Sequence, residues 1–427
     1  MGKTALLQPR DLGFARAEFD RYYRQAEIPV PFSIEMREFA FAQFGTDGAG
    51  PFVRHRAFSD VGSFRQELDR LVPRHLYYST SLYEDPGHLS MKQKRWTGAE
   101  VIFDLDADHL RNAEGLSYLS QLQLAKERFQ YLLEEFLWGD FGLDEEDVDI
   151  VFSGGRGYHA HIHADAYLHL TSMERRELVD HIQGIGFQPE EDAFETVTEA
   201  LPRVHGGSRT YRRLAAPDAA GWKGRMSRAV LRWLDEHQKD TEEQMTEEVL
   251  DLLSEGLPEA RKGLRQRARS IAHHLASEET LAAIAGRQTL ETLGNDENRD
   301  LFLKALARRL AVPIQGETDA PVTTDVHRLI RMPGSLHGGT GFRVLPLTRK
   351  ELGLFEPMRD ATLPTGSNEE LDVTLLQTVE YEASPARMKG SVGDQIRVPR
   401  VLALFLILRG EATLELVIPS HTRHQDP

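Results

Sequence analysis

The segment GAEVIFDLDADHL, residues 98–110, predicts the central strand of the fold. It opens with an apolar run typical of a buried strand, and the alternation that follows places Asp104 and Asp106 on one strand face. Residues 117–138 have the amphipathic pattern of a helix, and Val148–Phe152 is a second buried-strand pattern. Strand, helix and strand in this order predict a crossover unit in an α+β fold.

The chain around this unit divides into a core and an insertion. A mixed-sheet α/β core is expected from residues 1–170 and 313–363, so the core is discontinuous in sequence. Strand-like segments flank the glycine-rich GTDGAG, residues 45–50, which predicts a hairpin. Residues 171–312 read almost throughout as helix, so we expect an all-helical insertion there. Residues 364–427 are expected to pack on the core, and their apolar run VLALFLIL fits a strand or a helix.

Composition excludes several classes of protein. The 427 residues carry 51 basic and 67 acidic side chains, a formal net charge of −16, which argues against a basic coat for nucleic acid or for anionic membranes. The absence of cysteine excludes disulfides, iron–sulfur ligation and thiolate zinc sites, and favours an intracellular protein. The longest apolar run is far shorter than the roughly 20 residues of a membrane span. We therefore expect a cytoplasmic protein without a membrane partner.

The paired acids of the first strand suggest a metal site. Because Asp104 and Asp106 are two residues apart, they leave the same strand face about 7 Å apart at the backbone, and their carboxylates can converge on one cation. Burying two like charges without a cation is costly, which favours Mg²⁺. The alternative is a strand end at which carboxylates meet solvent or cap a helix, and Asp108 is expected to be such a cap.

The segment SGGRGYH, residues 153–159, suggests an anion site directly after a buried strand. Its glycines can turn backbone N–H groups toward an anion, and Ser153, Arg156 and His159 add a hydroxyl, a guanidinium and an imidazole. It matches neither the P-loop nor the dinucleotide fingerprint, and the alternative is a glycine-rich hairpin with an incidental arginine. His161 and His163 continue the alternation of His159, so the three imidazoles are also possible metal ligands.

A third cluster, DAPVTTDVHRLIRMPGSLHGGTGF, begins at Asp319. We assign metal chemistry to Asp319, which precedes a short β-rich stretch, and helix capping to Asp325, which precedes VHRLIR. Arg328 is expected to be a solvated charge on that helix. The helix end and the loop after it supply further anion-binding groups, namely Arg331, Ser335 and His337.

Three acids and two basic segments together describe a site for a metal-bound triphosphate. Two ions about 4 Å apart can activate an attacking hydroxyl and stabilise the leaving pyrophosphate, which is nucleotidyl transfer. This interpretation requires Asp319 to return across the helical segment to the side of Asp104 and Asp106.

At this point the sequence strongly resembles the catalytic small subunit of archaeal and eukaryotic-type DNA primases, and most closely the archaeal form. FDRYYR, REFAF, FVRHRAF, EVIFDLDADHL, VFSGGRGYHAHI and VTTDVHRLIRMPGSLHG follow the family's order over roughly residues 12–345. The resemblance implies two Mg²⁺ or Mn²⁺ ions on Asp104, Asp106 and Asp319. It also implies nucleotide-phosphate contacts at Ser153, Arg156, His159, Arg331 and His337, with the arginine of the early strand at Arg54.

The resemblance implies synthesis of short RNA primers, possibly also DNA, from nucleoside triphosphates on a single-stranded DNA template. It implies a heterodimer with a primase large subunit, which bears the iron–sulfur domain, and a place at the nucleoid. The family's cysteine-containing zinc knob is absent or replaced, and Gly155 and Arg331 stand where some relatives have Arg and Lys. Residues 206–214, GGSRTYRRL, form a candidate template wall or a solvated loop.

Three rival functions use the same residues. A metal-dependent nuclease or phosphohydrolase would employ the acids with His159, His161 and His163 as ligands. A repair primase-polymerase would share the whole site. A partner-binding scaffold would carry the site as a relic, which the intact acids argue against.

Overall fold

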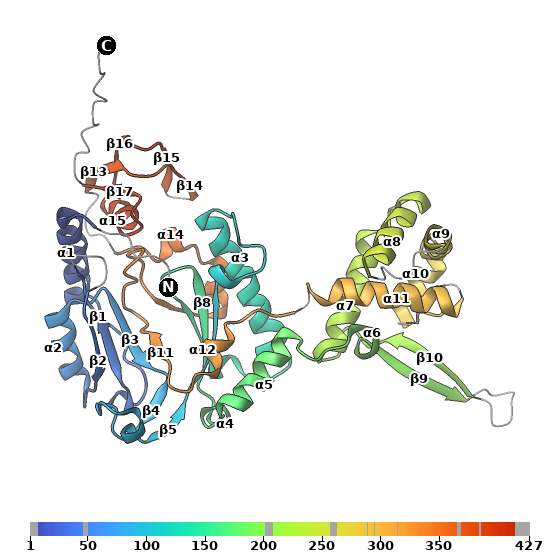
Figure 1. Ribbon diagram of the computed structural model, residues 1–427, viewed down its shortest axis with the longest axis horizontal. Helices are drawn as coiled ribbons and strands as arrows, with labels where there is room; N and C mark the ends of the chain where they lie inside the picture. Colours follow the sequence, from blue (N-terminus) through green and yellow to red (C-terminus); the bar gives the residue numbers. More distant parts are fainter. Residues whose placement is uncertain are drawn as a thin grey trace, which may run out of the picture. The chain divides into compact units, whose positions relative to one another are not determined.

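The computed structural model describes residues 7–45, 50–200, 208–256, 263–287, 289–293, 295–313, 315–364, 369–383 and 386–414. These residues form two compact units (Figure 1). Unit 1 draws on Met1–Gln130, Leu143–Val179 and Glu317–Pro427, and unit 2 draws on Tyr131–Gly142 and Asp180–Gly316. Unit 2 thus begins and ends slightly later than the insertion expected at 171–312, and it includes the short segment 131–142 as well.

Unit 1 contains a four-stranded antiparallel sheet with the strand order β11-β3-β1-β2. Its strands are β1 (Phe39–Ala42), β2 (Phe52–Arg56), β3 (His75–Ser79) and β11 (Leu329–Arg331). The predicted hairpin is confirmed by the pairing of β1 with β2, and residues 46–49 of its turn lie outside the described residues. One face of the sheet packs on α1 (Pro9–Gln25) and α2 (Val61–Leu71), where four aromatic rings share a core, namely Phe19, Phe39, Phe41 and Phe64.

The second sheet of unit 1 holds the predicted crossover unit. Its strand order is β12-β7-β8-β6, and its strands are β6 (Val101–Asp106), β7 (Val148–Phe152), β8 (Gly157–Ile162) and β12 (Leu345–Leu347). Because β8 is antiparallel to both β6 and β7, these two strands are parallel to each other. The helix between them, α3 (Tyr118–Tyr131), makes the crossover, and it continues into a π-helical segment, Leu132–Trp138. The α+β class is therefore confirmed, with β8 placed between the two strands of the crossover.

The segment after unit 2 returns to both sheets of unit 1. It forms α12 (Ala320–Thr324), then β11 in the first sheet and β12 in the second. Two local predictions are wrong here: a helix follows Asp319 instead of a β-rich stretch, and the last residues of VHRLIR form a strand instead of a helix. The triplet Leu-Ile-Arg alternates in burial and pairs with the open edge of β3, a long-range contact that the local pattern does not contain.

The last described elements, up to residue 414, pack on α1. The apolar run forms a helix, α15 (Arg400–Leu408), whose Arg400 guanidinium lies 2.6 Å from the Glu18 carboxylate of α1. The Asp11 carboxylate accepts hydrogen bonds of 2.8 Å from the Thr413 hydroxyl and from the backbone N–H of Leu414. The remaining elements of unit 1 are β4 (Ser81–Tyr83), β5 (Trp96–Ala99), α4 (Asp165–Leu168), α5 (Ser172–Gln183, whose last residues belong to unit 2), α13 (Arg349–Leu354), α14 (Pro357–Asp360), β13 (Glu370–Leu375), β14 (Val379–Ala383), β15 (Ala386–Gly390), β16 (Gln395–Pro399) and β17 (Ala412–Thr413).

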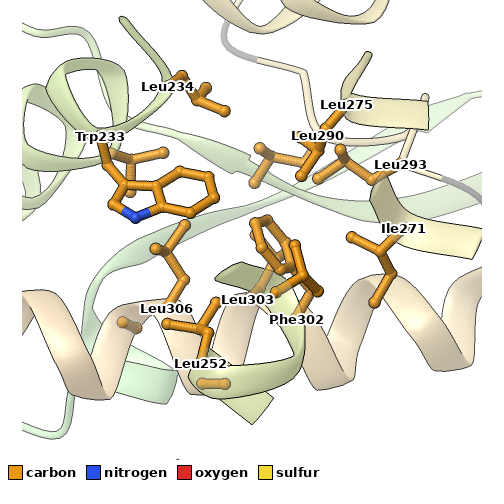
Figure 2. Close-up of a cluster of buried hydrophobic side chains, with 14 of the residues drawn as sticks. Trp233, Leu234, Leu252, Ile271, Leu275, Leu290, Leu293, Phe302, Leu303 and Leu306 are labelled. Atoms are coloured by element: carbon orange, nitrogen blue, oxygen red, sulfur yellow. The ribbon is translucent and has the colours of Figure 1, made fainter. Parts of the chain in front are cut away.

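Unit 2 is mostly helical and has its own core. Its helices are α6 (Pro189–Asp192), α7 (Gly221–Glu236), α8 (Glu242–Gly256), α9 (Leu264–Leu275), α10 (Glu278–Arg287) and α11 (Asp296–Ala311). Figure 2 shows Trp233 of α7 and Phe302 of α11 among the side chains of this core. Among the described residues, none of the helices combines the length and the apolar content that a bilayer crossing demands.

Unit 2 also contains an antiparallel hairpin, which differs from the expected all-helical insertion. The hairpin consists of β9 (Phe194–Ala200) and β10 (Ser208–Leu214), paired from end to end. Its sequence FETVTEA is rich in β-branched residues and alternates in the strand period, a signal too short to stand out among the surrounding helices. The described part of GGSRTYRRL is therefore a strand and not a loop, and residues 201–207 lie outside the described residues.

A buried charge cluster stabilises unit 2, and it generates a first prediction. The Asp140 carboxylate lies 2.8 Å from the Arg225 guanidinium and 2.6 Å from His181, and the Asp140 and Arg225 side chains are almost fully buried. Substituting Asp140→Ala leaves Arg225 buried and unpaired, so the free energy of unfolding should fall by about 3 kcal/mol. Urea unfolding followed by tryptophan fluorescence measures this, with the exposed Asp296→Ala as control. Equal stability of the two variants would contradict the assignment.

Candidate active site

The structure brings the three predicted acids together. Asp104 and Asp106 alternate on β6, and Asp319 precedes the first residue of α12. The backbone N–H of Asp319 donates a 2.8 Å hydrogen bond to the backbone carbonyl of Asp104, and the Thr318 hydroxyl donates to the same carbonyl at 3.2 Å. The spatial expectation on which the sequence interpretation depended is therefore met, because the chain returns to β6 after the whole of unit 2.

The buried grouping of carboxylates raises the pKa of Asp104. Burial and the neighbouring carboxylates of Asp106 and Asp319 raise the pKa of Asp104 to about 7, and Arg328 and Arg331 only partly oppose this rise. Ionised carboxylates this close need a compensating charge. Clustered carboxylate oxygens in a polar site are the ligands that Mg²⁺ and Mn²⁺ prefer, so the donor set fits a divalent cation.

Each carboxylate is turned to a neighbour of its own. Asp104 Oδ1 lies 3.5 Å from His159 Nε2, and Asp319 Oδ2 lies 3.5 Å from His109 Nδ1. Asp106 Oδ1 accepts a 3.2 Å hydrogen bond from the backbone N–H of Asp108. Within the described ranges, no group of three or more His, Asp or Glu side chains has a shared metal-ligand geometry. Holding a cation therefore requires these carboxylates to turn from their present partners.

The glycine-rich loop between β7 and β8 is shaped by close packing. Ser153 Oγ accepts hydrogen bonds from the N–H groups of Gly155, at 3.2 Å, and of Gly157, at 3.3 Å. A Cβ atom on Gly157 would lie 2.2 Å from the carbonyl oxygen of Leu105, so only glycine allows β8 to run beside β6 at this point. The Ser153 hydroxyl thus organises the loop, and its contact with phosphate stays a prediction.

Arg156 and His159 both approach the acidic strand β6 from the side of β8. Arg156 forms an ion pair with Asp108, so Asp108 does not act as the expected helix cap through its carboxylate. His159 is buried beside Asp104, and its Nδ1 has no hydrogen-bond partner among the described residues. Burial, reinforced by His161, Arg331 and Arg328, holds the pKa of His159 well below its ordinary value. Imidazole and guanidinium groups therefore flank the carboxylates as the sequence predicts.

A second basic segment joins the glycine-rich loop. Arg331 ends β11, and its Nη1 lies 2.5 Å from His75 Nδ1. His337 Nδ1 lies 3.1 Å from the Thr340 hydroxyl, which donates a 2.6 Å hydrogen bond to the carbonyl of Gly154. Gly154 has a φ of +74°, and a Cβ atom there would lie 2.8 Å from His337 Cβ. The two predicted anion-binding segments therefore form one continuous wall.

Two polar residues near this wall have structural roles. Ser335 is fully buried, and its hydroxyl donates a 2.6 Å hydrogen bond to the carbonyl of Met332, so its predicted anion-binding role is wrong. Asp325 follows α12 and accepts a 2.9 Å hydrogen bond from the N–H of His327, so it stabilises a turn and does not cap the start of a following helix.

Arg54 stands in a different local cluster. Its guanidinium lies 2.9 Å from the Glu38 carboxylate, which also binds Lys94 Nζ at 2.9 Å. None of its described contacts involves the acids of β6 or α12, so its predicted contact with nucleotide stays a prediction.

The histidine triad of the nuclease hypothesis does not form a metal centre in the described residues. His161 Nδ1 lies 3.1 Å from the Tyr78 hydroxyl, which donates to Glu100 at 3.4 Å. His163 lies 3.8 Å from the exposed Asp149. The three imidazoles thus have different partners although they alternate along one strand.

Sequence reasoning missed two groups. Glu100 is buried beside Arg37, 3.3 Å away, and together they support Tyr78 and His161. Arg328 acts electrostatically on both Asp104 and His159, so it belongs to the site and is not merely a solvated charge. Its position between two predicted site residues, Asp319 and Arg331, is the one sequence signal that pointed to it.

The raised pKa of Asp104 predicts a pH-dependent stability. Because its folded-state pKa is about 7 against an ordinary 3.8, ionisation destabilises the fold: the penalty is absent below pH 3.8, grows up to pH 7 and is complete above it. Without divalent cations, Asp104→Asn should therefore be more stable than the wild type by roughly 4 kcal/mol at pH 8, with the difference disappearing toward pH 4. Chemical denaturation across this range in EDTA measures it.

The exposed Asp372→Asn serves as the control for this experiment, because its carboxylate is 75% exposed. It should follow the wild type at every pH. Parallel stability curves for the wild type and Asp104→Asn would show that the carboxylates do not interact as described.

Comparison with known proteins identifies the family. The family model of the DNA primase small subunit matches residues 103–349. A protein named DNA primase small subunit PriS from Methanocella arvoryzae is 34% identical over 94% of this chain and 98% of its own length. Proteins of the same name from Methanothrix thermoacetophila and Haloarcula marismortui are 34% and 33% identical over 93% and 95% of this chain, and over 98% and 99% of their own lengths. The chain therefore belongs to the DNA primase small subunit family.

Proposed function

We propose that this chain is the catalytic subunit of a DNA primase, which makes short RNA primers from nucleoside triphosphates on single-stranded DNA. The observation that carries the proposal is the convergence of Asp104, Asp106 and Asp319, with the pKa of Asp104 raised to about 7, beside the basic wall of Arg156, Arg331 and His337. A metal-bound triphosphate requires carboxylates that hold its cations and, next to them, basic groups that bind its phosphates.

The three carboxylates would hold two Mg²⁺ or Mn²⁺ ions. When bound, such ions activate the attacking 3′-hydroxyl and neutralise charge on the leaving pyrophosphate. The carboxylates of β6 and α12 fix where the reacting phosphate must lie, because the backbone hydrogen bond between Asp319 and Asp104 sets their spacing. Nucleotidyl transfer rests on this positioning, since the chain contributes no nucleophile of its own.

The basic wall would bind the triphosphate. Arg156 and Arg331 offer planar donors for phosphate oxygens, and His337 is held at the glycine-rich loop by Thr340. Binding of phosphate to Arg156 competes with its present ion pair to Asp108. Arg156 can therefore exchange its internal partner, the Asp108 carboxylate, for a substrate phosphate.

The partner would be a primase large subunit. The relatives' printed name, small subunit, supports a heterodimer, and the family resemblance assigns the iron–sulfur domain to the larger partner. A protein of this function acts at the nucleoid. Degradation of the template in place of chain extension would instead support the nuclease alternative, which the separation of the three imidazoles disfavours.

The proposal predicts that Asp106→Asn abolishes primer synthesis. Loss of one carboxylate removes a ligand and a charge, so the rate should fall by about 1000-fold, while the thermal unfolding of unit 1 changes little. The assay incubates single-stranded template with labelled nucleotides and Mn²⁺ and resolves the products by length. Asp149→Asn on β7, two strands away from β6, has a side chain that is 70% exposed and should remain active. Synthesis near the wild-type rate by Asp106→Asn would overturn the metal assignment.

Arg156→Ala should weaken nucleotide binding. Because a guanidinium–phosphate contact is lost, the dissociation constant for a fluorescent nucleoside triphosphate should rise about tenfold, and Arg156→Lys should recover only part of the loss. Titration by fluorescence anisotropy measures both values, and the exposed Arg397→Ala is the control for lost positive charge. An unchanged dissociation constant for Arg156→Ala would remove this residue from the phosphate site.

A further inference from the structure

We propose that the face of the β11-β3-β1-β2 sheet opposite α1 and α2 binds single-stranded DNA, with Phe52 as a stacking platform for a nucleobase. This inference rests on the proposed function, and it adds a surface that the three acids do not define. The inference rests on the difference between the side chains on the two faces of the sheet.

The two faces of this sheet have different compositions. The core shared with α1 and α2 takes the apolar side chains of alternate positions, namely Phe39, Phe41, Leu76, Tyr78 and Ile330. By strand alternation, the residues between them lie on the other face. These are Ala40, Ala42, His75, Tyr77 and Arg331, and Phe52 joins them because it is paired directly with Ala42.

On this face two aromatic rings meet above small residues. The rings of Phe52 on β2 and Tyr77 on β3 lie 6.0 Å apart between centroids, although β1 runs between their strands. Ala40 and Ala42 occupy β1 at that point, and their short side chains leave room for the contact. Phe52 is 52% exposed, which is unusual for a ring of this size and leaves much of it open to stacking.

The aromatic pair is continuous with the basic wall of the candidate active site. The Tyr77 ring lies 6.1 Å from the ring of His75, and the His75 ring lies 5.2 Å from that of His337. The Arg331 guanidinium lies 5.4 Å from the centroid of Tyr77. A DNA strand that places one nucleotide at His337 and Arg331 can therefore place the adjacent nucleotides along this sheet face.

Positive charge accompanies the aromatic rings. Next to Phe52, the Arg54 side chain is 37% exposed, and a bulge at His55, which has a φ of +61°, shapes the strand at this point. The buried Glu38 carboxylate holds both Arg54 and Lys94, so two cations face one carboxylate in this cluster. Lys94 is fully buried, so Arg54 and Arg331 supply the positive charge of this face, although the chain carries a net charge of −16.

This combination fits single-stranded DNA better than a folded protein or a duplex. Unpaired bases expose their ring faces, and each can stack on an aromatic side chain whatever its sequence, while guanidinium groups follow the phosphates. A duplex keeps its base faces stacked and unavailable. An apolar protein partner would not call for the arginines that flank Phe52.

The test measures binding of a fluorescent oligothymidylate in the full-length protein by anisotropy. Phe52→Ala should raise the dissociation constant about tenfold, and Phe52→Trp should keep it near the wild-type value, because stacking on one base is lost in the first variant and kept in the second. The affinity for a nucleoside triphosphate with Mn²⁺ should not change in either. Leu354→Ala, which removes an apolar side chain that is 69% exposed on α13, is the matched control.

Two further measurements identify the contact. An oligonucleotide with abasic sites should bind the wild type about as weakly as Phe52→Ala binds the intact strand, and the variant should not distinguish the two strands. Photo-crosslinking with 5-iododeoxyuridine should attach the strand to a peptide that contains Phe52 or Tyr77.

The outcomes separate this inference from the proposed function. If the wild type extends primers but Phe52→Ala binds the intact strand as tightly as the wild type, the stacking surface is wrong and the active site stands. If Phe52→Ala loses affinity for intact and abasic strands equally, the face acts through charge alone and the stacking role is also overturned. If the wild type neither binds single-stranded DNA nor makes primers, the proposed function fails as well.

Discussion

Two hydrogen bonds to one backbone carbonyl hold the candidate active site together against its own charge. Burial and the neighbouring carboxylates of Asp106 and Asp319 raise the pKa of Asp104, yet the Asp319 N–H group and the Thr318 hydroxyl both donate to the Asp104 carbonyl. Because these bonds use backbone atoms of β6, they leave the carboxylates free to bind other groups. The fold therefore imposes an unfavourable electrostatic arrangement, and a bound cation would relieve it.

The opposite wall of the site is built by close approach of backbones. The glycine-rich loop can rest on β6 and on the segment of His337 only because Gly154 and Gly157 lack side chains. The Thr340 hydroxyl then ties the two basic segments through the Gly154 carbonyl. Residues near positions 155 and 337 thus form one surface, so a substitution that displaces one loop should also displace the other.

Local sequence patterns predicted the elements and residues that depend only on amino acids close together in the sequence. The strand of Asp104, the helix after it, the hairpin of β1 and β2 and the three acids all follow from alternation, helical spacing and residue chemistry. The strand identity of Leu329–Arg331 was not predictable in this way, since it arises from the open edge of β3. The pairing of Arg156 with Asp108 and the burial of Ser335 likewise depend on contacts that only the folded chain creates.

His159, the histidine beside the acids, shows how burial and neighbouring groups set the protonation state of a side chain. Burial, with His161 and two arginines, keeps the pKa of His159 well below its ordinary value, so this imidazole is neutral at neutral pH. A protonated His159 would form an ion pair with Asp104 and compete with a cation for it. The His161 ring lies 5.8 Å from the His159 ring, and His161 Nδ1 lies 3.1 Å from the Tyr78 hydroxyl. Burial of this imidazole thereby preserves the negative charge that a metal site needs.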